Sequence, residues 1–315
     1  MWQVFSGVFL GWSLGSNDAA NVFGTAVASR MVRFSTAAVL CSLFVILGAV
    51  LEGAKGFATY QGMSPTALNE AFVVGLAAAL TVTLMSFLHL PVSTSQAVVG
   101  ALVLVGVMRD SLDLGQLAKV VACWVGTPIG AAVITMVVYF LVGKLMNWLH
   151  LSLFSYDRYL RWALLIAGSY GAYALGANNV ANVTGAFVTP DGLTPLQATV
   201  IGGVAIALGV VTYSRNVMMT VGRNLVRLDA YTAFIAILSE ALTVHFYAKL
   251  GVPVSTSQAI VGAVLGVGII KGSRTINRRT LTRILFGWLG TPTISAAVAA
   301  ALFVGMMAVG LLEPR

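Results

Sequence analysis

Residues 15–25 read GSNDAANVFGT, a short run of small and polar residues inside an otherwise apolar part of the chain. A related run, GANNVANVTGA, occupies residues 176–186, which is 161 positions later (176 − 15). A second motif is also present twice, because PVSTSQA at residues 91–97 returns at residues 253–259, 162 positions later (253 − 91). The nearly equal spacing of the two pairs indicates that the chain is a duplicated unit.

The composition places the chain in a membrane. Of its 315 residues, 58% are hydrophobic and 9% are charged, and the mean hydropathy is +0.92. Soluble domains carry about 25% charged residues, so this chain has too few to cover a soluble surface. Residues 71–108 and 284–312 contain no Asp, Glu, Lys or Arg, and a spanning helix needs only about 20 apolar residues. Because these runs do not alternate as barrel strands do, we expect an all-α polytopic membrane protein in contact with lipid.

Each half of the chain contains five apolar segments in the same order. A third echo, WVGTP at 124–128 and WLGTP at 288–292, keeps nearly the same register. The expected segments are residues 2–29, 35–58, 69–89, 92–108 and 117–146, followed by 160–189, 194–222, 230–250, 253–270 and 283–312. The pattern predicts a first transmembrane repeat over residues 1–146, a cytoplasmic linker over 147–160 and a second repeat over 161–315.

The third and fourth segments of each half lie too close together for an ordinary loop at the membrane surface. Only residues 89–92 separate them in the first half, and only residues 250–254 in the second. A re-entrant helical hairpin, whose tip stops partway through the bilayer, fits this spacing better. Each half then has three spanning helices, and because this number is odd the two repeats must be inverted. Inverted repeats are a transporter architecture, with the binding site near the midplane where the repeats meet.

The basic residues predict the orientation. With the N-terminus outside, 13 of the 18 Lys and Arg residues fall in cytoplasmic loops, as the positive-inside rule requires. We therefore expect a multi-pass protein of the inner cell membrane with both termini extracytoplasmic. The net charge of +8 then reflects these loops and does not indicate nucleic-acid binding.

The PVSTSQA motif predicts an anion site. Proline sets a turn, and the hydroxyl residues after it open a helix whose N-terminal N–H groups carry partial positive charge. Two such helix ends from inverted repeats can face one another across a tetrahedral anion. The candidate substrate-binding residues are Ser93, Thr94, Ser95, Gln96, Ser255, Thr256, Ser257 and Gln258. The structural alternative is a capping box, with Ser at the N-cap and Gln at N3.

The motif at the start of the first repeat predicts a cation or substrate path. Asn17, Asp18 and Asn21 share a helix face. Because Gly15 can interrupt the helix before them, we expect the first helix of each repeat to be broken at this motif. A carboxylate inside a membrane segment is costly and marks a functional site by default. With amide oxygens beside it, Asp18 makes a hard-oxygen site for Na⁺ or a proton carrier. The alternative is a hydrogen-bond partner that holds a broken helix together. In the second copy Asn179 takes the place of the acid.

Glu240 is a second acid within an apolar segment. Its counterpart in the first half is Ala78 (240 − 162), so the repeats do not share it. By the same reasoning it is a possible coupling acid, with a salt bridge to Lys249 or a helix end as the structural alternative. The sequence contains no Walker motif and no nucleophile elbow, so we expect no enzyme, no catalytic residue and no cofactor. Energy must then come from an ion gradient or another chain.

At these residues the sequence resembles the inorganic phosphate transporter (PiT) family, which includes the sodium-phosphate symporters of animals. That family carries a Gly-Ala-Asn-Asp-Val-Ala-Asn type motif near the start of each repeat and a Pro-Val-Ser-Thr-Thr-His type motif in each hairpin. The resemblance covers nearly the whole chain and implies Na⁺- or H⁺-coupled uptake of phosphate by inverted repeats in a homodimer. It implies an anion site made of Asp18, Asn21, Asn182, Ser93, Thr94, Ser255 and Thr256. It implies a Na⁺ site near Asn17, Asp18, Asn178 and Asn179.

Four positions depart from the family pattern. Asn179 replaces the Asp of the second motif, Gln96 and Gln258 replace His, and Leu175 stands where a His often precedes the second motif. Sulfate has no proton to donate and suits a site of neutral donors, and the family includes sulfate permeases. Hydrogen phosphate needs an acceptor, which Asp18 supplies. We therefore expect a symporter that imports phosphate by alternating access, with a sulfate permease, an anion channel and a membrane scaffold as alternatives.

Overall fold

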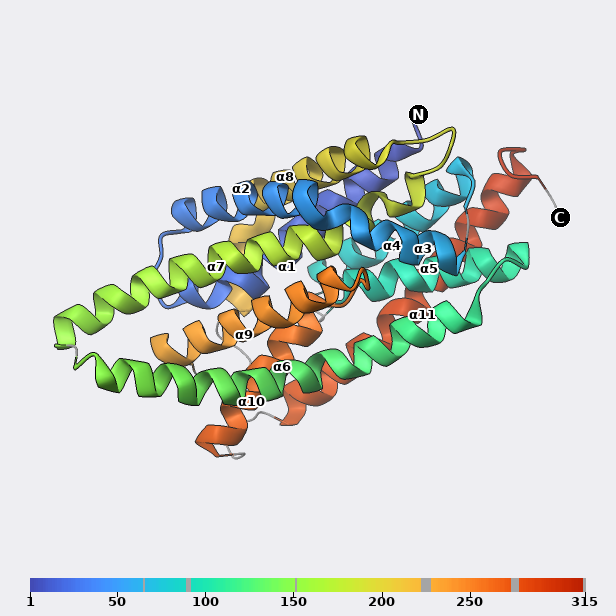
Figure 1. The fold of residues 1–315 in the computed structure, drawn as a ribbon. Coiled ribbons are helices and arrows are strands. Elements are labelled where there is room, and N and C mark those ends of the chain that lie inside the picture. Colours follow the sequence, from blue (N-terminus) through green and yellow to red (C-terminus); the bar gives the residue numbers. More distant parts are fainter. Residues whose placement is uncertain (65, 89–91, 151, 222–227, 273–277, 314–315) are drawn as a thin grey trace.

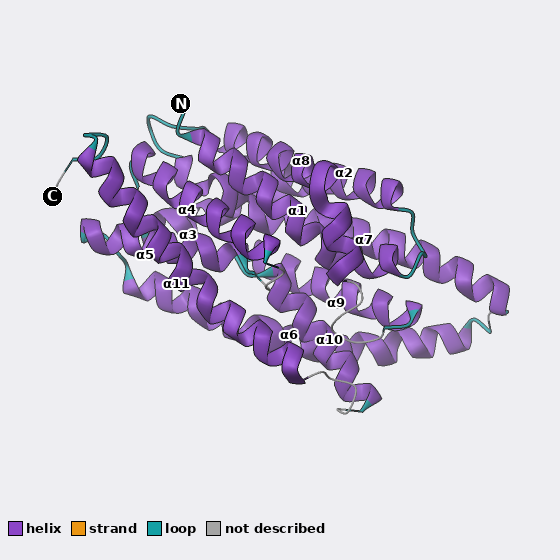
Figure 2. Ribbon diagram, turned by 180° about the vertical axis from the view of Figure 1, so that it is seen from behind, coloured by secondary structure: helices purple, strands orange, loops and turns teal. Residues whose placement is uncertain are grey.

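The computed structural model describes residues 1–315 except residues 65, 89–91, 151, 222–227, 273–277 and 314–315 (Figure 1). Within that part of the chain every regular element is a helix, as Figure 2 shows, which confirms the all-α prediction. The first half contains α1 (Val4–Ala28), α2 (Phe34–Glu52), η1 (Gly53–Gly56), α3 (Phe57–Met63), α4 (Leu68–Phe87), α5 (Thr94–Arg109) and α6 (Leu114–Trp148). The second half contains α7 (Leu153–Thr184), η2 (Gly185–Phe187), α8 (Pro195–Val221), α9 (Ala230–Lys249), α10 (Thr256–Lys271) and α11 (Arg278–Ala308).

The described residues include six helical spans that are long and apolar enough to cross a bilayer. They are Phe34–Met63, Leu68–Phe87, Leu114–Trp148, Pro195–Met219, Ala230–Lys249 and Leu281–Ala308. α5 and α10 are apolar but have only 16 residues each, which suits the returning arm of a hairpin better than a full crossing. Large apolar side chains such as Val125, Ile129 and Phe140 on α6 are exposed on the outside of the molecule, where lipid is the natural solvent. The chain is a multi-pass membrane protein.

The first helix of each half is continuous, so the predicted break at Gly15 is wrong. α1 runs unbroken from Val4 to Ala28, and α7 likewise passes through Gly176. These glycines serve close helix packing instead. A Cβ on Gly15 would lie 1.9 Å from the carbonyl oxygen of Ile206 in α8, and one on Gly176 would lie 2.0 Å from that of Val45 in α2. A helical glycine costs about 1 kcal/mol relative to alanine, and the backbone contact that it allows offsets this cost.

Helices of the first half pack mainly on helices of the second half. α1 packs on α8 and α7 packs on α2, while α5 packs on α11 and α10 packs on α6. Glycines mark the second exchange too, because a Cβ on Gly100 would lie 2.3 Å from the Pro292 carbonyl oxygen, and one on Gly262 would lie 2.2 Å from that of Pro128. Each of these contacts is reproduced at the corresponding positions of the other half. The two halves are therefore interleaved, and the two larger clusters of buried hydrophobic residues each contain residues of both halves.

Counterpart helices run in opposite directions. In Figure 1, α1 and α7 are antiparallel, and so are α6 and α11. Both termini lie at the same end of the molecule (Figure 1). This is the arrangement that an inverted duplication requires when each unit has an odd number of crossings.

The junction between the halves is more helical than a loop. α6 continues to Trp148 and α7 begins at Leu153, so residues 147–160 mostly extend these two helices. The segment expected as a linker is therefore mostly helical in its described residues.

Each hairpin is closed at its base by an ion pair. Arg109 Nε at the end of α5 lies 2.5 Å from Glu70 Oε1 at the start of α4. Lys271, which corresponds to Arg109 (271 − 109 = 162), pairs with Asp229 at the start of α9. The pairs hold the two arms of each hairpin together at the end that is far from the tip. In the first hairpin, residues 89–91 at the tip, which include the proline of the motif, lie outside the described residues.

Candidate functional site

The two hairpin tips meet inside the protein. Ser95 Oγ on α5 donates a hydrogen bond to the carbonyl oxygen of Val254 (3.0 Å), and Ser257 Oγ on α10 donates one to the carbonyl oxygen of Val92 (3.1 Å). The bonds are reciprocal, because Ser95 and Ser257 occupy corresponding positions in the two motifs. Ser95 is only 1% exposed. The N-terminal ends of α5 and α10 therefore face a common buried region, as the anion-site prediction requires.

The predicted capping box forms only in part. Ser93 Oγ accepts from the Gln96 backbone N–H (3.4 Å) and Ser255 Oγ accepts from that of Gln258 (3.2 Å). The side-chain carbonyl oxygens of both glutamines are buried, and neither has a hydrogen-bond partner among the described residues. Capping thus explains the two serines but leaves the two glutamines available for a ligand.

The motif of α1 contacts the hairpin of the other half. Asp18 Oδ2 accepts a hydrogen bond from Thr256 Oγ1 (3.0 Å), and Asp18 Oδ1 accepts one from Asn17 Nδ2 (2.9 Å). Asn21 Nδ2 donates to Thr256 Oγ1 (3.4 Å) and to Ser257 Oγ (3.3 Å). Asp18 is 2% exposed, and no basic side chain in the described part of the chain forms an ion pair with it. A buried carboxylate without a positive partner is costly, which makes this position suitable for a transported cation.

The motif of α7 contacts the first hairpin in the corresponding way. Asn182 Nδ2 donates to Ser95 Oγ (3.0 Å) and to Asn179 Oδ1 (2.7 Å). Tyr60, on the short helix α3, donates its hydroxyl hydrogen bond to Asn182 Oδ1. The sequence analysis missed Tyr60, and no local pattern could have revealed it, since its partner lies 122 residues away.

The side chain of Asn178 is hydrogen-bonded to the backbone of the second hairpin tip. Its side-chain Nδ2 donates to the Val254 carbonyl oxygen (2.8 Å), and its Oδ1 accepts from the Val254 backbone N–H (3.2 Å). Both ends of the amide therefore hold the tip of the second hairpin. Asn17, its counterpart in the first half, is instead turned toward Asp18.

The replacement of Asp by Asn leaves two polar groups unpaired where α7 meets the first hairpin. Thr94 and Asn179 correspond to Thr256 and Asp18, which hydrogen-bond to each other. Thr94 Oγ1 and Asn179 Nδ2 are buried and have no partner among the residues described. An unsatisfied buried polar group costs about 1–3 kcal/mol, so a cluster of them at one place points to a ligand. Both groups can donate hydrogen bonds, which suits an oxyanion.

Glu240 lies on α9 and is fully buried. Neither carboxylate oxygen has a hydrogen-bond partner in the described structure, and a Cβ on Gly171 of α7 would lie 3.5 Å from Oε2. The alternative of a salt bridge to Lys249 is wrong, because Lys249 Nζ lies 2.9 Å from Glu52 Oε1. Glu240 therefore remains the second buried acid that no described cation neutralises.

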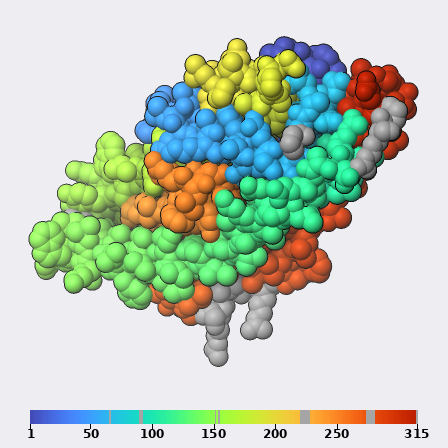
Figure 3. Space-filling view, turned by 45° about the vertical axis from the view of Figure 1, so that its right-hand side comes forward, coloured from blue at the N-terminus to red at the C-terminus, as the bar shows by residue number. Residues whose placement is uncertain are grey.

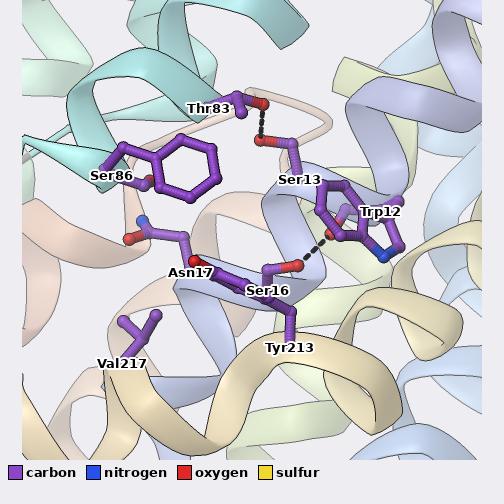
Figure 4. A pocket seen from close by; sticks show the side chains of 9 residues that line it. Trp12, Ser13, Ser16, Asn17, Thr83, Ser86, Tyr213 and Val217 are labelled. Atoms are coloured by element: carbon purple, nitrogen blue, oxygen red, sulfur yellow. Dashed lines mark hydrogen bonds between the residues drawn. The ribbon is translucent and has the colours of Figure 1, made fainter.

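A small pocket opens beside Asn17, between α1, α4 and α8 (Figure 4). Its cavity volume is about 20 Å³, roughly the room that one water molecule needs. Its lining residues are Trp12, Ser13, Ser16, Asn17, Thr83, Ser86, Phe87, Tyr213 and Val217. Asn17 thus stands between this pocket and the carboxylate of Asp18.

The corresponding place in the second half carries charged groups instead. A wide crevice there lies between α2, α7 and α9, which meet at the surface in Figure 3. Glu52 accepts hydrogen bonds from Tyr173 (2.8 Å) and Lys249 (2.9 Å), and His245 Nε2 lies 3.4 Å from the same carboxylate. His245 Nδ1 is also hydrogen-bonded to the Tyr170 hydroxyl (2.8 Å).

Comparisons with known proteins agree with this geometry. The model of the family described as "Phosphate transporter family" matches residues 14–156 and again residues 154–299. A protein of Methanocaldococcus jannaschii named "Putative phosphate permease" is 32% identical over 290 residues, covering 92% of each chain. The sulfate permease CysP of Bacillus subtilis is 30% identical over 301 residues, covering 93% of this chain and 84% of the permease. A solved structure titled "The sodium-dependent phosphate transporter" has the same fold, with a TM-score of 0.83 at 24% identity over 97% of this chain and 98% of that one.

Proposed function

The chain belongs to the phosphate transporter family, and from this premise we propose that it is a symporter that imports inorganic phosphate together with Na⁺. The family and the fold are those of transporters. The observation that carries the proposal is the meeting of two buried helix N-termini beside a buried carboxylate that has no cationic partner among the described residues.

The anion is proposed to bind at the hairpin tips. Helix N-termini and hydroxyl groups stabilise an oxyanion without bringing a full positive charge into the membrane. The first hairpin contributes Thr94, and α7 contributes Asn179 and Asn182. The second hairpin contributes Thr256, and α1 contributes Asn21. Ser93, Ser255 and the two glutamines complete the set, and Ser95 and Ser257 hold the tips together.

The co-ion is proposed to bind at Asp18. A cation there neutralises the carboxylate and reduces the charge that accompanies the anion, so each ligand increases the affinity for the other. Asn17 supplies a neutral oxygen, and Glu240 is a second candidate for coupling. Asn178 is proposed to act through the hairpin tip that it holds. A proton on Asp18 could serve the same purpose, and this form of coupling is the alternative that an imposed pH gradient tests.

Alternating access follows from the proposed inverted repeats. The first repeat comprises residues 1–146 and the second residues 161–315, joined by the turn within 147–160. Rocking of one set of exchanged helices against the other would open the tips to each side in turn. We further propose that both termini lie outside the inner cell membrane, and the excess of basic residues in one set of loops supports this orientation. We further propose a homodimer in this membrane.

A sulfate permease is the second candidate. The neutral Asn179 beside Thr94 suits an anion that has no proton to donate, and a relative of this chain is named as a sulfate permease. Phosphate is favoured because Asp18 remains as an acceptor near the same hairpin.

The test is uptake of labelled phosphate and sulfate into proteoliposomes under imposed Na⁺ or pH gradients. We expect phosphate uptake that rises with an inward Na⁺ gradient. Uptake of sulfate alone would favour the second candidate, and an ionic current that is independent of both gradients would indicate a channel.

A further inference from the structure

The proposed binding site is buried in this structure. Ser95 and Thr256 at the hairpin tips are each 1% exposed, and Asp18 is 2% exposed. A transporter that works by alternating access has to open such a site to each side of the membrane in turn. Contacts that hold a hairpin against its neighbouring helices therefore have to break during the cycle. In each hairpin, one such contact joins the last residue of the first arm to a helix of the other half.

This contact is polar in the second hairpin. Lys249, the last residue of α9, donates to Glu52 Oε1 at the end of α2 (2.9 Å), and the Tyr173 hydroxyl on α7 donates to the same oxygen (2.8 Å). The Lys249 side chain is 53% exposed. Since ionisable side chains at membrane depth face the protein interior or water, water reaches the outer side of this contact. Glu52, Tyr173 and Lys249 are called the polar latch below.

The contact is aromatic in the first hairpin. Phe87, the last residue of α4, lies edge-on to Tyr213 of α8, with ring centroids 6.0 Å apart. The Trp12 ring of α1 lies 5.8 Å from the same Tyr213 ring. Figure 4 shows Trp12 and Tyr213 among the side chains that line the small pocket. Trp12, Phe87 and Tyr213 are called the aromatic latch.

The two latches occupy corresponding positions in the two halves. The corresponding pairs are Phe87 and Lys249 (87 + 162), Trp12 and Tyr173 (12 + 161), and Tyr213 and Glu52 (213 − 161). Two glycines confirm the register of α2 against α8. A Cβ on Gly48 would lie 2.0 Å from the Tyr173 carbonyl oxygen, and one on Gly209 would lie 2.0 Å from that of Trp12. The same contact is therefore built from charges in one half and from aromatic rings in the other.

The latches lie at hairpin ends that point in opposite directions. In Figure 1, α9 runs toward the end of the molecule that carries both termini, and Lys249 is its last residue. The first hairpin has its base at that end, because Arg109 Nη1 donates to the Glu313 carbonyl oxygen (3.0 Å). α4 therefore runs away from the termini toward Phe87. The polar latch thus faces the terminal side and the aromatic latch faces the other side.

We propose that the two latches open the site alternately. The polar latch breaks when the site opens toward the termini, and the aromatic latch breaks when the site opens to the other side. This inference rests on the proposed alternating access and names the side chains that control it.

The two latches should differ in how readily they open. An ion pair weakens once water surrounds it, so water that enters beside Lys249 helps to separate the polar latch. Separation of the aromatic rings exposes apolar surface to water, which opposes it. Opening toward the termini is therefore the easier of the two steps.

The experiment measures how fast a membrane-impermeant maleimide labels one engineered cysteine, after Cys41 and Cys123 have been replaced by alanine. Val254→Cys reports opening toward the termini, because Val254 is fully buried at the tip of the second hairpin. Val92→Cys, at the tip of the first hairpin, reports opening to the other side; Val92 is 2% exposed. Whole cells and inside-out vesicles present the two sides of the membrane to the reagent.

The polar latch is tested by Lys249→Met. We expect it to raise the labelling rate of Val254→Cys in whole cells at least about fivefold, because it shifts the population toward the open state. Glu52→Gln, which removes the charge from the other partner, should give an increase of the same size. Lys55→Met is the matched control, because Lys55 Nζ lies 3.3 Å from the same carboxylate but does not join it to the hairpin. It should leave the labelling rate within about twofold.

The aromatic latch is tested in the same way from the other side. Phe87→Ala should raise the labelling rate of Val92→Cys in inside-out vesicles at least about fivefold. Phe9→Ala is the matched control, because the Phe9 ring stacks on Trp12 from the same helix, with centroids 6.1 Å apart, and does not contact the hairpin through that stack. It should leave the labelling rate within about twofold.

A converted latch tests the difference in chemistry. Glu52→Tyr combined with Lys249→Phe installs the residues that the other half carries at these positions. The double change should lower the labelling rate of Val254→Cys in whole cells at least about threefold, opposite in sign to Lys249→Met.

Equal labelling rates in folded Lys249→Met and Lys55→Met proteins would overturn the polar latch, and equal rates in Phe87→Ala and Phe9→Ala would overturn the aromatic one. An increase in the converted protein would overturn the stated difference between them. Labelling needs no transport, so a wild-type protein that takes up no phosphate under any gradient would reject the proposed function while these rates still test the latches.

Discussion

The two halves of this transporter share a helix arrangement and differ in their chemistry at one pair of positions. On α1 of the first half, Asp18 accepts a hydrogen bond from Thr256 of the second hairpin. At the corresponding positions, Asn179 on α7 and Thr94 of the first hairpin have no such bond, because Asn179 Nδ2 and Thr94 Oγ1 are unpaired among the described residues. In the proposed mechanism, both halves contribute to the anion site and only the first half supplies the carboxylate for the cation.

The largest expected effect comes from making the halves alike. Asp18→Asn should reduce Na⁺-stimulated phosphate uptake roughly 100-fold, near the upper end of the usual coupling between two ligands. The reason is that this carboxylate is the group at which the cation is proposed to bind. Uptake by proteoliposomes with and without a Na⁺ gradient measures this.

The exchanged variant sharpens the same comparison. Asp18→Asn combined with Asn179→Asp moves the carboxylate to α7, where Asn178 is bonded to Val254 and is not turned toward residue 179 as Asn17 is turned toward Asp18. It should not restore Na⁺ dependence. Full restoration would show that the two halves are equivalent at this pair of positions.

The two threonines should differ in their effects. Thr256→Val removes a hydrogen bond to a charged group, and we expect the Na⁺-dependent phosphate affinity to fall about tenfold, equivalent to roughly 1.4 kcal/mol. Thr94→Val removes a hydroxyl that has no described protein partner, so it should weaken phosphate binding about threefold and leave the Na⁺ dependence unchanged. Equal effects on the Na⁺ dependence would contradict the assignment of the cation to the first half.

Tyr60→Phe should have a smaller effect on phosphate affinity than Thr256→Val. The hydroxyl bonds Asn182 Oδ1 and so directs the Asn182 amide nitrogen toward Ser95. Its loss should raise the phosphate KM about threefold to fivefold, with no change in the Na⁺ concentration for half-maximal uptake. A shift in the Na⁺ dependence alone would contradict this role, because it would show that Tyr60 affects cation binding and not phosphate binding.

The smallest effects are expected at the hairpin bases. Glu70 and Arg109 are 9% and 23% exposed at their side chains, whereas Asp229 and Lys271 are 57% and 30% exposed. Solvent screens the second pair more strongly, so Lys271→Met should cost under about 0.5 kcal/mol of stability. Arg109→Met should cost about 1–2 kcal/mol, because it leaves Glu70 nearly buried without its partner. Thermal unfolding in detergent compares the two variants.

The stability contributed by the Asp229–Lys271 ion pair of the second hairpin should also depend on pH. Burial alone would raise the pKa of Asp229, but hydrogen bonds from Lys271 and Thr232 outweigh it and hold the pKa below the ordinary value of 3.8. The carboxylate therefore stabilises the fold above pH 3.8, and this contribution is lost as the pH falls through the lower folded-state pKa. Lys271→Met should remove this part of the pH dependence of thermal unfolding.

The repeats, the hairpins and the residues at their tips could be predicted from the sequence because they are encoded locally. A charge-free run of fixed length and a doubled motif are visible without knowledge of tertiary contacts. Asp18 and Glu240 were identified for the same reason, since an acid in an apolar segment is conspicuous.

The rest depends on contacts between distant parts of the chain. The sequence predicted a break at Gly15 because glycine permits one, but the carbonyl of Ile206, which fills the space of a Cβ there, comes from another half of the chain. Asn178 was expected at the cation, and only the structure shows that both ends of its amide hold Val254. Tyr60 was missed because its hydrogen-bond partner, Asn182, lies 122 residues away on another helix.

The most direct test of the account is equilibrium binding of labelled phosphate to the purified wild-type protein at several Na⁺ concentrations. The account predicts that the phosphate Kd falls as Na⁺ rises, and that phosphate strengthens Na⁺ binding by the same factor. A phosphate Kd that is independent of Na⁺ would contradict the claim that the carboxylate of the first half links the cation to the anion.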